Sequence, residues 1–329
     1  FKKIFALIPE VKKPSEKKVS FNIKLKWTLI VLGAFFILAN ISLFGLASAA
    51  LERFEYLAII LGTDFGSIIS LGIGPIVMAS IILQLLTGAG IIRIDLNSSE
   101  GKKFFQGLQK LLVFFFIIFE SLVYVLMNGL EALPGYTGLV IFQLILGGLA
   151  IYYMNEVSEK WGFGSGVSLF IGAGVSWRLI ASAFQFINTQ GKSCLMDFAG
   201  TPCSGKVLVL IQSIISNQKN PTEFLAALAA IAATVIIFLV VVWAQSLKVE
   251  IPLSYGKIRG YGMKWPLSFF YSSVIPVIFA AALVANVQLF GGMLENWLGH
   301  ATFLGHFVNG QAISGLAFWM GSTNILDLT

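Results

Sequence analysis

Seven apolar stretches separated by polar segments constrain this chain more than any other feature of its sequence. A helix needs about 20 mainly apolar residues to cross a lipid bilayer. The stretches that meet or approach this length are residues 27–46, 70–86, 111–127, 139–154, 167–186, 225–244 and 268–290. Only 12% of the 329 residues are charged, about half the usual share in soluble domains. These features exclude a soluble enzyme or a disordered chain, and we expect an all-α, polytopic membrane helix bundle.

The distribution of basic residues predicts the orientation of these spans. With the N-terminus placed inside, most of the 22 Lys and Arg residues fall in segments on the inner side. Cytoplasmic loops carry an excess of Lys and Arg, so we expect a multi-pass protein of the cytoplasmic membrane with its N-terminus in the cytoplasm. Seven spans then leave the last residue outside, which favours a fragment of a longer protein.

Three segments do not fit simple spans. Residues 71–75 read LGIGP, and because Pro suits the first helical turn, we expect a new helix to begin there. Residues 54–61 would cover only about 12 Å as a helix, so we interpret them as a re-entrant half-helix entering from outside. Such irregular backbone must be buried or line a cavity, which implies a cavity on the outer side. Residues 1–10 fit either a surface amphipathic helix or a frayed terminus.

Groups that perform chemistry are scarce. The sequence has no HExxH motif and no P-loop, and its predicted spans contain only Glu120 and Arg178 as ionisable residues. Glu120 fits a hydrogen-bonded structural acid as well as a pathway residue. Cys194 and Cys203 share one polar loop assigned to the outside, where oxidising conditions favour a structural disulfide. We expect no enzyme activity, no metal and no cofactor.

These assignments divide the chain into five segments. They are a cytoplasmic N-terminal segment (1–26), a first half with five spans (27–186), an external loop (187–224), two further spans joined by a cytoplasmic loop at 245–264 (225–290), and an external tail without a closing element (291–329).

Four sequence blocks carry more specific information: LGIGPIV running on to ILQLL (71–86), GFGSG (162–166), IPLSYG (251–256), and IPVI running on to NVQL (275–289). In order and spacing they resemble the SecY family, and its archaeal branch in particular. Members of that family form the pore of the Sec protein-conducting channel. The resemblance implies a ten-span pore of two pseudo-symmetric halves, of which spans eight to ten are absent here. It also implies passage of secretory chains across the cytoplasmic membrane and of membrane-protein segments into it.

The resemblance assigns a pore ring and a plug to matching positions. The ring residues are Ile73, Val77, Val167, Ile171 and Ile278. A narrow aliphatic collar makes non-directional contacts and sheds water, which hinders ions at rest. The same side chains also fit ordinary helix packing in lipid. The half-helix at 54–61 matches the plug, represented by Phe54, Tyr56, Leu57, Ile59 and Ile60.

The resemblance also implies a lateral gate and partners. Glu120 and Asn286 match polar gate positions, although Asn286 equally fits an ordinary interhelical hydrogen bond. Ribosome docking falls on basic residues that positive-inside topology alone would also explain: Lys248, Lys257, Arg259 and Lys264. The implied partners are a small SecE- or gamma-type subunit, a small beta-type subunit, the ribosome through its rRNA, signal sequences and nascent chains, and the lipid bilayer.

A secondary transporter for a small solute is the alternative from another functional class, because transporters also contain inverted repeats and broken helices. A transporter site needs convergent polar groups near the middle of the membrane, where this sequence offers Ile and Val. A membrane-embedded lipid enzyme lacks candidate acids, bases and metal ligands.

Overall fold

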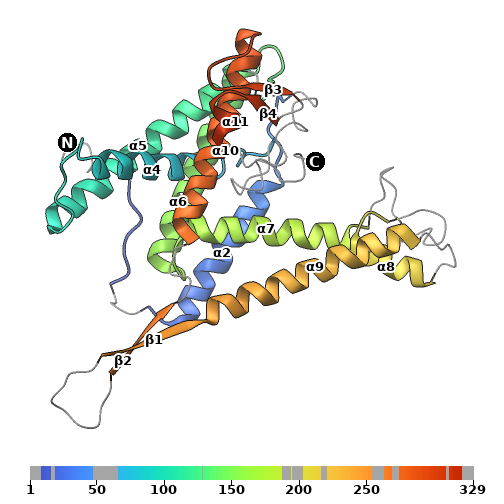
Figure 1. Cartoon of the computed structure of the whole chain (residues 1–329). Coiled ribbons are helices and arrows are strands. Elements are labelled where there is room, and N and C mark those ends of the chain that lie inside the picture. The colour runs from blue at the N-terminus through green and yellow to red at the C-terminus, as the bar shows by residue number, and fades with distance from the viewer. Residues whose placement is uncertain are drawn as a thin grey trace. The chain divides into compact units, whose positions relative to one another are not determined.

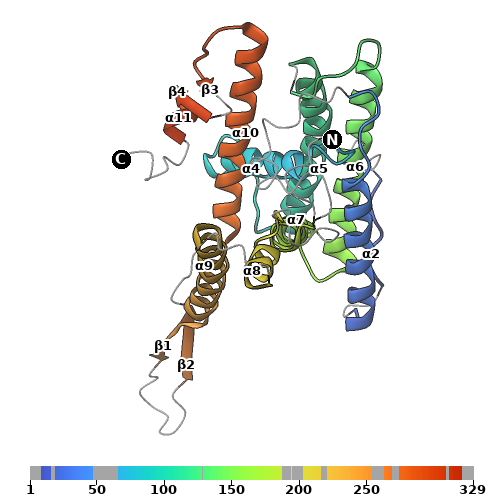
Figure 2. The ribbon, with the colours of Figure 1, turned by 90° about the vertical axis from the view of Figure 1, so that its right-hand side faces the viewer.

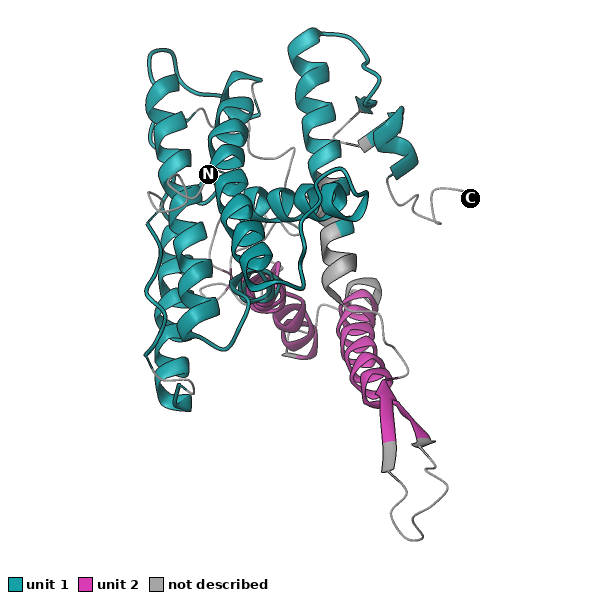
Figure 3. Cartoon of the chain, turned by 90° about the vertical axis from the view of Figure 1, so that its left-hand side faces the viewer, with its two compact units in different colours: residues 1–175, 277–329 teal, residues 176–276 magenta. Residues whose placement is uncertain are grey.

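The computed structural model describes residues 9–15, 19–46, 66–127, 129–186, 194, 203–215, 221–253, 263–268, 274–308 and 311–320. The chain forms two compact units (Figure 3), one of residues 1–175 and 277–329 and one of residues 176–276. Among the described residues, five helices are long and apolar enough to cross a membrane. The prediction of a helical membrane bundle is therefore confirmed, with short strands added to it.

The first unit is built mainly from helices. Its helices are α2 (Phe21–Ala39), α4 (Gly74–Gly88), α5 (Ser99–Leu126), α6 (Thr137–Trp161), the first half of α7 (Gly166–Phe184) and α10 (Val274–Leu298). Helix α5 packs against both α4 and α6, and α2 lies alongside α6 (Figures 1 and 2). The unit ends with the strands β3 (His306–Val308) and β4 (Gln311–Ser314) and the short helix α11 (Leu316–Met320).

The main core of this unit joins all the helices from α2 to α7. Phe35 of α2 stacks on Phe170 of α7 with ring centroids 5.0 Å apart. Gly148 of α6 allows Ile117 of α5 to approach, because a Cβ atom at position 148 would lie 2.9 Å from an Ile117 methyl carbon. Dense packing of apolar side chains therefore fixes how these helices meet.

The predicted first span, 27–46, is wrong at both ends. Helix α2 begins six residues earlier, at Phe21, and takes in Lys24 and Lys26, whose long side chains can carry their charges away from the apolar surface. It ends at Ala39, where the Asn40 side chain donates to the Phe36 carbonyl at 2.8 Å. The residues after α2 pair with residues 66–68, which precede α4. Leu43 N–H donates to the Gly66 carbonyl, and Ile68 N–H donates to the Ile41 carbonyl.

Three other predicted boundaries also need correction. Helix α5 begins at Ser99 rather than at 111, because the Ser98 hydroxyl accepts from Gly101 N–H and caps a polar first turn. Helix α4 begins at Gly74, and residue 70 still lies in a series of turns. The predicted span 268–290 starts in a strand, and the helix runs from Val274 to Leu298 instead. Hydropathy does not distinguish an apolar strand end from a helix start, which explains the last error.

The predicted external tail has more structure than expected. Residues 291–298 belong to α10, and a hairpin of β3 and β4 follows. Glu295 of α10 accepts from Phe307 N–H at 2.7 Å and contacts His306, which ties this hairpin to the helix.

The second unit contains the remainder of α7, helices α8 (Lys206–Ile215) and α9 (Pro221–Ser246), and the strands β1 (Lys248–Leu253) and β2 (Met263–Ser268). Helices α8 and α9 pack side by side (Figure 1), and β1 pairs antiparallel with β2. Helix α9 exposes nearly continuous apolar side chains from Val235 to Trp243, as expected for a helix that contacts lipid.

Candidate functional site

The segment before α4 is non-helical backbone buried inside the first unit. Residues 66–73 form successive turns in which Gly72 N–H bonds to the Ile69 carbonyl and Gly74 N–H to the Leu71 carbonyl. Gly72 has a φ of +53°, a left-handed conformation that favours glycine. Helix α4 then begins at Gly74 with Pro75 in its first turn, as the LGIGP motif predicts. Burial of this segment agrees with the rule that irregular backbone at membrane depth must be covered by protein.

Glycine at position 147 allows α6 to lie directly on this segment. A Cβ atom at Gly147 would lie only 1.8 Å from the Ile68 carbonyl oxygen. The Ser70 hydroxyl completes the turn by accepting from Gly66 N–H and donating to the Ser67 carbonyl. The turns are therefore held both by their own hydrogen bonds and by the close approach of α6.

Four of the five aliphatic side chains predicted for the pore ring lie in one cluster. Ile73 and Val77 are almost fully buried, at 0% and 1% exposure, and are one helical turn apart. Val167 and Ile171 of α7 are half-buried and pack against the same cluster. Ile278 lies in α10, and its side chain is outside the described residues. The same cluster also contains Phe35, Tyr152 and Phe170, so this arrangement fits both a ring and a packed core.

Both residues predicted for the lateral gate are fully buried. Glu120 lies on α5 and Asn286 on α10. Glycine at position 74 makes room for the Glu120 carboxylate, since a Cβ atom there would lie 3.0 Å from Glu120 Oε2. The Glu120 carboxylate is thus packed against the first turn of α4, which directly follows Ile73.

The predicted plug residues, Phe54, Tyr56, Leu57, Ile59 and Ile60, lie outside the described residues, as do Lys257 and Arg259. The other two residues predicted for ribosome docking are on the paired strands, with Lys248 opposite Ser268 and Lys264 opposite Pro252. The structure joins Cys194 and Cys203 in a disulfide. Both cysteines are buried with Leu208 of α8, and Gln212 of that helix accepts from Cys203 N–H.

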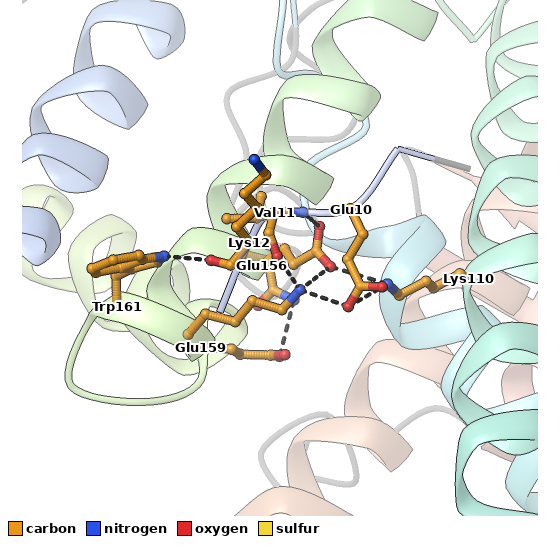
Figure 4. A network of polar contacts seen from close by, with 9 residues as sticks. Glu10, Val11, Lys12, Lys110, Glu156, Glu159 and Trp161 are labelled. Carbon is orange, nitrogen blue, oxygen red and sulfur yellow. Dashed lines mark hydrogen bonds and ion pairs between the residues drawn. The ribbon is translucent and has the colours of Figure 1, made fainter. Parts of the chain in front are cut away.

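A polar network that the sequence analysis missed lies at the end of α6 (Figure 4). Lys110 of α5 and Lys160 of α6 each contact the carboxylates of Glu10 and Glu156, at 2.7 to 3.2 Å. Backbone groups of the N-terminal segment join it, since Val11 N–H donates to Glu156 and Lys160 donates to the Val11 carbonyl. The hydrogen bond from Lys160 lowers the pKa of Glu10, supported by Lys110 and opposed by partial burial.

The fold and this site define a class: a multi-pass helical membrane protein with broken backbone buried beside an aliphatic cluster. The family model for SecY matches residues 67–326, and the chain belongs to the SecY family. It is 42% identical over 332 residues to the protein translocase subunit SecY of Methanothermobacter thermautotrophicus, covering 99% of this chain and 70% of that protein. It is 38% identical to the SecY subunit of Methanocaldococcus jannaschii, covering 97% and 68%.

Solved structures give the same result. A structure described as that of a protein conducting channel matches with a TM-score of 0.76 and 38% identity, covering 96% of this chain and 68% of that chain. Sec61 in the canine ribosome-channel complex from the endoplasmic reticulum matches with a TM-score of 0.74 and 38% identity, with the same coverage. The resemblance noted in the sequence is therefore confirmed at the level of the family.

Proposed function

We propose that this chain is a channel subunit for protein translocation. It passes secretory chains across the cytoplasmic membrane and membrane-protein segments into it. The observation that carries the proposal is that Ile73, Val77, Val167 and Ile171 lie in or against one hydrophobic core, beside buried broken backbone in a chain of the SecY family. The name of the relatives and the solved protein-conducting channel support it.

The chemistry of the cluster suits this task. A pore that admits chains of any sequence needs contacts without direction, and Ile and Val side chains supply only these. A narrow apolar constriction also loses its water and so hinders ions while the channel rests. A small-solute transporter would instead need polar groups that recognise its substrate. On this proposal the subunit performs no chemical reaction itself.

The remaining roles belong to the same proposal. The N-terminus faces the cytoplasm, residues 54–61 act as the plug, and Glu120 and Asn286 are polar groups of the lateral gate. The loop 245–264 docks the ribosome, which the canine ribosome-channel complex supports. Contacts between Lys257 or Arg259 and rRNA phosphates would then weaken steeply with salt. Two small subunits, of the SecE or gamma type and of the beta type, complete the channel.

The experiment that tests the ring measures ion conductance of resting channels in planar bilayers. We expect the substitutions Ile73→Ser and Ile171→Ser, made in the assembled channel, to raise this conductance, because each places a hydroxyl in the constriction. The matched control is Ile151→Ser, because Ile151 of α6 is as buried as Ile73 and belongs to the same cluster but not to the ring. Background conductance in the ring variants, or an equal rise in the control, would rule out the ring.

A further inference from the structure

The start of α7 is held by a side chain from another helix. The first four N–H groups of a helix lack partners within it, and a side chain just before the helix commonly accepts one of them. Here the acceptor for Val167 N–H is Oδ1 of Asn155, from α6, at 3.0 Å. Asn155 is itself buried, with 6% exposure.

A second contact fixes which way this amide points. Asn155 Nδ2 donates to Glu159 Oε1 at 3.0 Å, one turn further along α6. The nitrogen end of the amide is therefore engaged by a carboxylate, which leaves the oxygen end directed at Val167. Glu159 and Val167 thus define a single orientation of the Asn155 side chain.

Glycine at position 166 brings the two helices into direct contact at this point. A Cβ atom at Gly166 would lie 2.6 Å from the Asn155 Cα and 2.7 Å from its Oδ1. The connection between the helices is short and also bonded, with Gly162 N–H donating to the Ser158 carbonyl and the Ser158 hydroxyl donating to the Gly164 carbonyl. These contacts therefore fix both the axial position and the rotation of the first turn of α7 relative to α6.

These contacts act at Val167, the first of the two predicted ring residues on α7. Val167 is the residue whose N–H is held, and Ile171 lies one turn later on the same face. A shift of α7 by one residue would rotate both side chains by about 100° and move them off the aliphatic cluster. Phe170, which lies between Val167 and Ile171 in α7, stacks on Phe35 of α2.

We propose that Asn155 is a positioning residue for the pore ring. By accepting from Val167 N–H, it sets the axial position and the rotation of α7, and so directs Val167 and Ile171 toward the constriction. This inference rests on the proposed function, because it assigns Asn155 an effect on the channel seal rather than on the fold alone.

The test compares variants of the assembled channel by resting ion conductance. Asn155→Ala removes the acceptor, and we expect it to raise the conductance several-fold. The double variant Asn155→Asp with Glu159→Gln keeps an oxygen for Val167 N–H, reverses the second hydrogen bond and conserves the charge of the pair. We expect this swap to restore the seal, which a general loss of packing would not do.

Gln143→Ala is the matched control. Gln143 also lies on α6 and its amide also bridges to backbone, accepting from Phe44 N–H and donating to the Phe44 carbonyl, but it is not adjacent to the ring. We expect this control to leave the conductance unchanged. Each complex is first checked for a single symmetric peak on size exclusion. If Asn155→Ala does not assemble, the swap variant alone decides, with a sealed channel in support and a leaking one against.

The outcomes separate this inference from the proposed function. A sealed Asn155→Ala channel, or a swap that leaks as much as Asn155→Ala, overturns the positioning role while Ile171→Ser still leaks. If Ile73→Ser and Ile171→Ser do not leak either, the ring itself is wrong and the positioning role is overturned with it.

Discussion

Lys160 Nζ and a carboxylate oxygen of Glu10 lie 2.7 Å apart, although 150 positions separate the two residues in the chain. The contact is part of a four-membered arrangement in which two lysines face two carboxylates. The indole N–H of Trp161 donates to the Lys12 carbonyl, so both side chains and backbone of the N-terminal segment are attached to α6. Residues 9–15 therefore serve as a strap that joins Lys110, within α5, to the end of α6.

The arrangement predicts that the two lysines substitute for one another. Glu156 is 6% exposed and is contacted by both Lys110 and Lys160. Either Lys110→Met or Lys160→Met leaves Glu156 one lysine as well as the Val11 N–H, and we expect each to cost about 1 kcal/mol of unfolding free energy. The double variant leaves a buried carboxylate without a lysine, and should cost about 3 kcal/mol or more. Thermal or denaturant unfolding of the purified protein measures these costs.

The control for this cycle is Lys103→Met, an exposed lysine on the same helix, α5, for which we expect no measurable change. The double variant must lose more stability than the two single variants together. Strict additivity would show that the lysines act on Glu156 independently.

The strap should also respond to pH. Because the pKa of Glu10 is lowered in the folded protein from its ordinary value of 4.5, the carboxylate stabilises the attached strap above that value. This stabilisation is lost as the pH falls through the lowered pKa. We expect protease cleavage within residues 9–15 to accelerate as the pH falls below about 4, and a pH-tolerant protease measures this.

Glu10→Gln is the control for the pH experiment. It removes the titrating group, so the variant should be cleaved faster at neutral pH and should show a smaller change with acid. Since Glu10 is 52% exposed, we also expect added salt to reduce the difference between the two proteins. Identical pH profiles for both would assign the response to other groups.

The disulfide gives a prediction for the second unit. Cys194 and Cys203 are the two cysteines of the chain and are joined to each other, so unreduced protein should show no reactive thiol after denaturation. Reduction should then release two. Closing a short loop of this kind stabilises a protein by about 2–3 kcal/mol, so Cys194→Ser with Cys203→Ser should lower the unfolding midpoint. Two reactive thiols in the unreduced protein would contradict the pairing.

The sequence predicts the helices of this fold better than their ends. Long apolar runs identify each span, and the LGIGP motif locates the start of α4 because Gly and Pro have defined backbone requirements. The start of α5 at Ser99 was missed because its first turns are polar and extend beyond the apolar run. Capping by Ser98 was the available signal there.

For the candidate site, too, the sequence indicates some residues and not others. The assignment of Ile73 and Ile171 to a ring is what the family resemblance implies and stays a prediction, whereas the lysine and carboxylate network depends on contacts across the fold. The spacing of Glu156 and Lys160 is the i, i+4 spacing of a helical ion pair and is visible in the sequence. Nothing local indicates that Glu10 joins them, because that contact exists only once the N-terminal segment lies against α5 and α6. Asn155 was missed for the same reason, since its partner Val167 belongs to the next helix.

Gly147 offers the sharpest test of how the broken backbone is held. A Cβ atom at this position would lie 1.8 Å from the Ile68 carbonyl oxygen. That oxygen belongs to the backbone, so it cannot move aside as the end of a flexible side chain could. Gly147→Ala must therefore push α6 away from residues 66–70, and we expect a loss of about 1–3 kcal/mol in unfolding free energy. Gly138 of the same helix has no atom within 4 Å of the equivalent position. Gly138→Ala should be neutral or stabilising by about 0.5–1 kcal/mol, since alanine favours a helix over glycine. Unfolding of the two variants side by side measures the difference, and equal stability would mean that α6 does not rest on the Ile68 carbonyl.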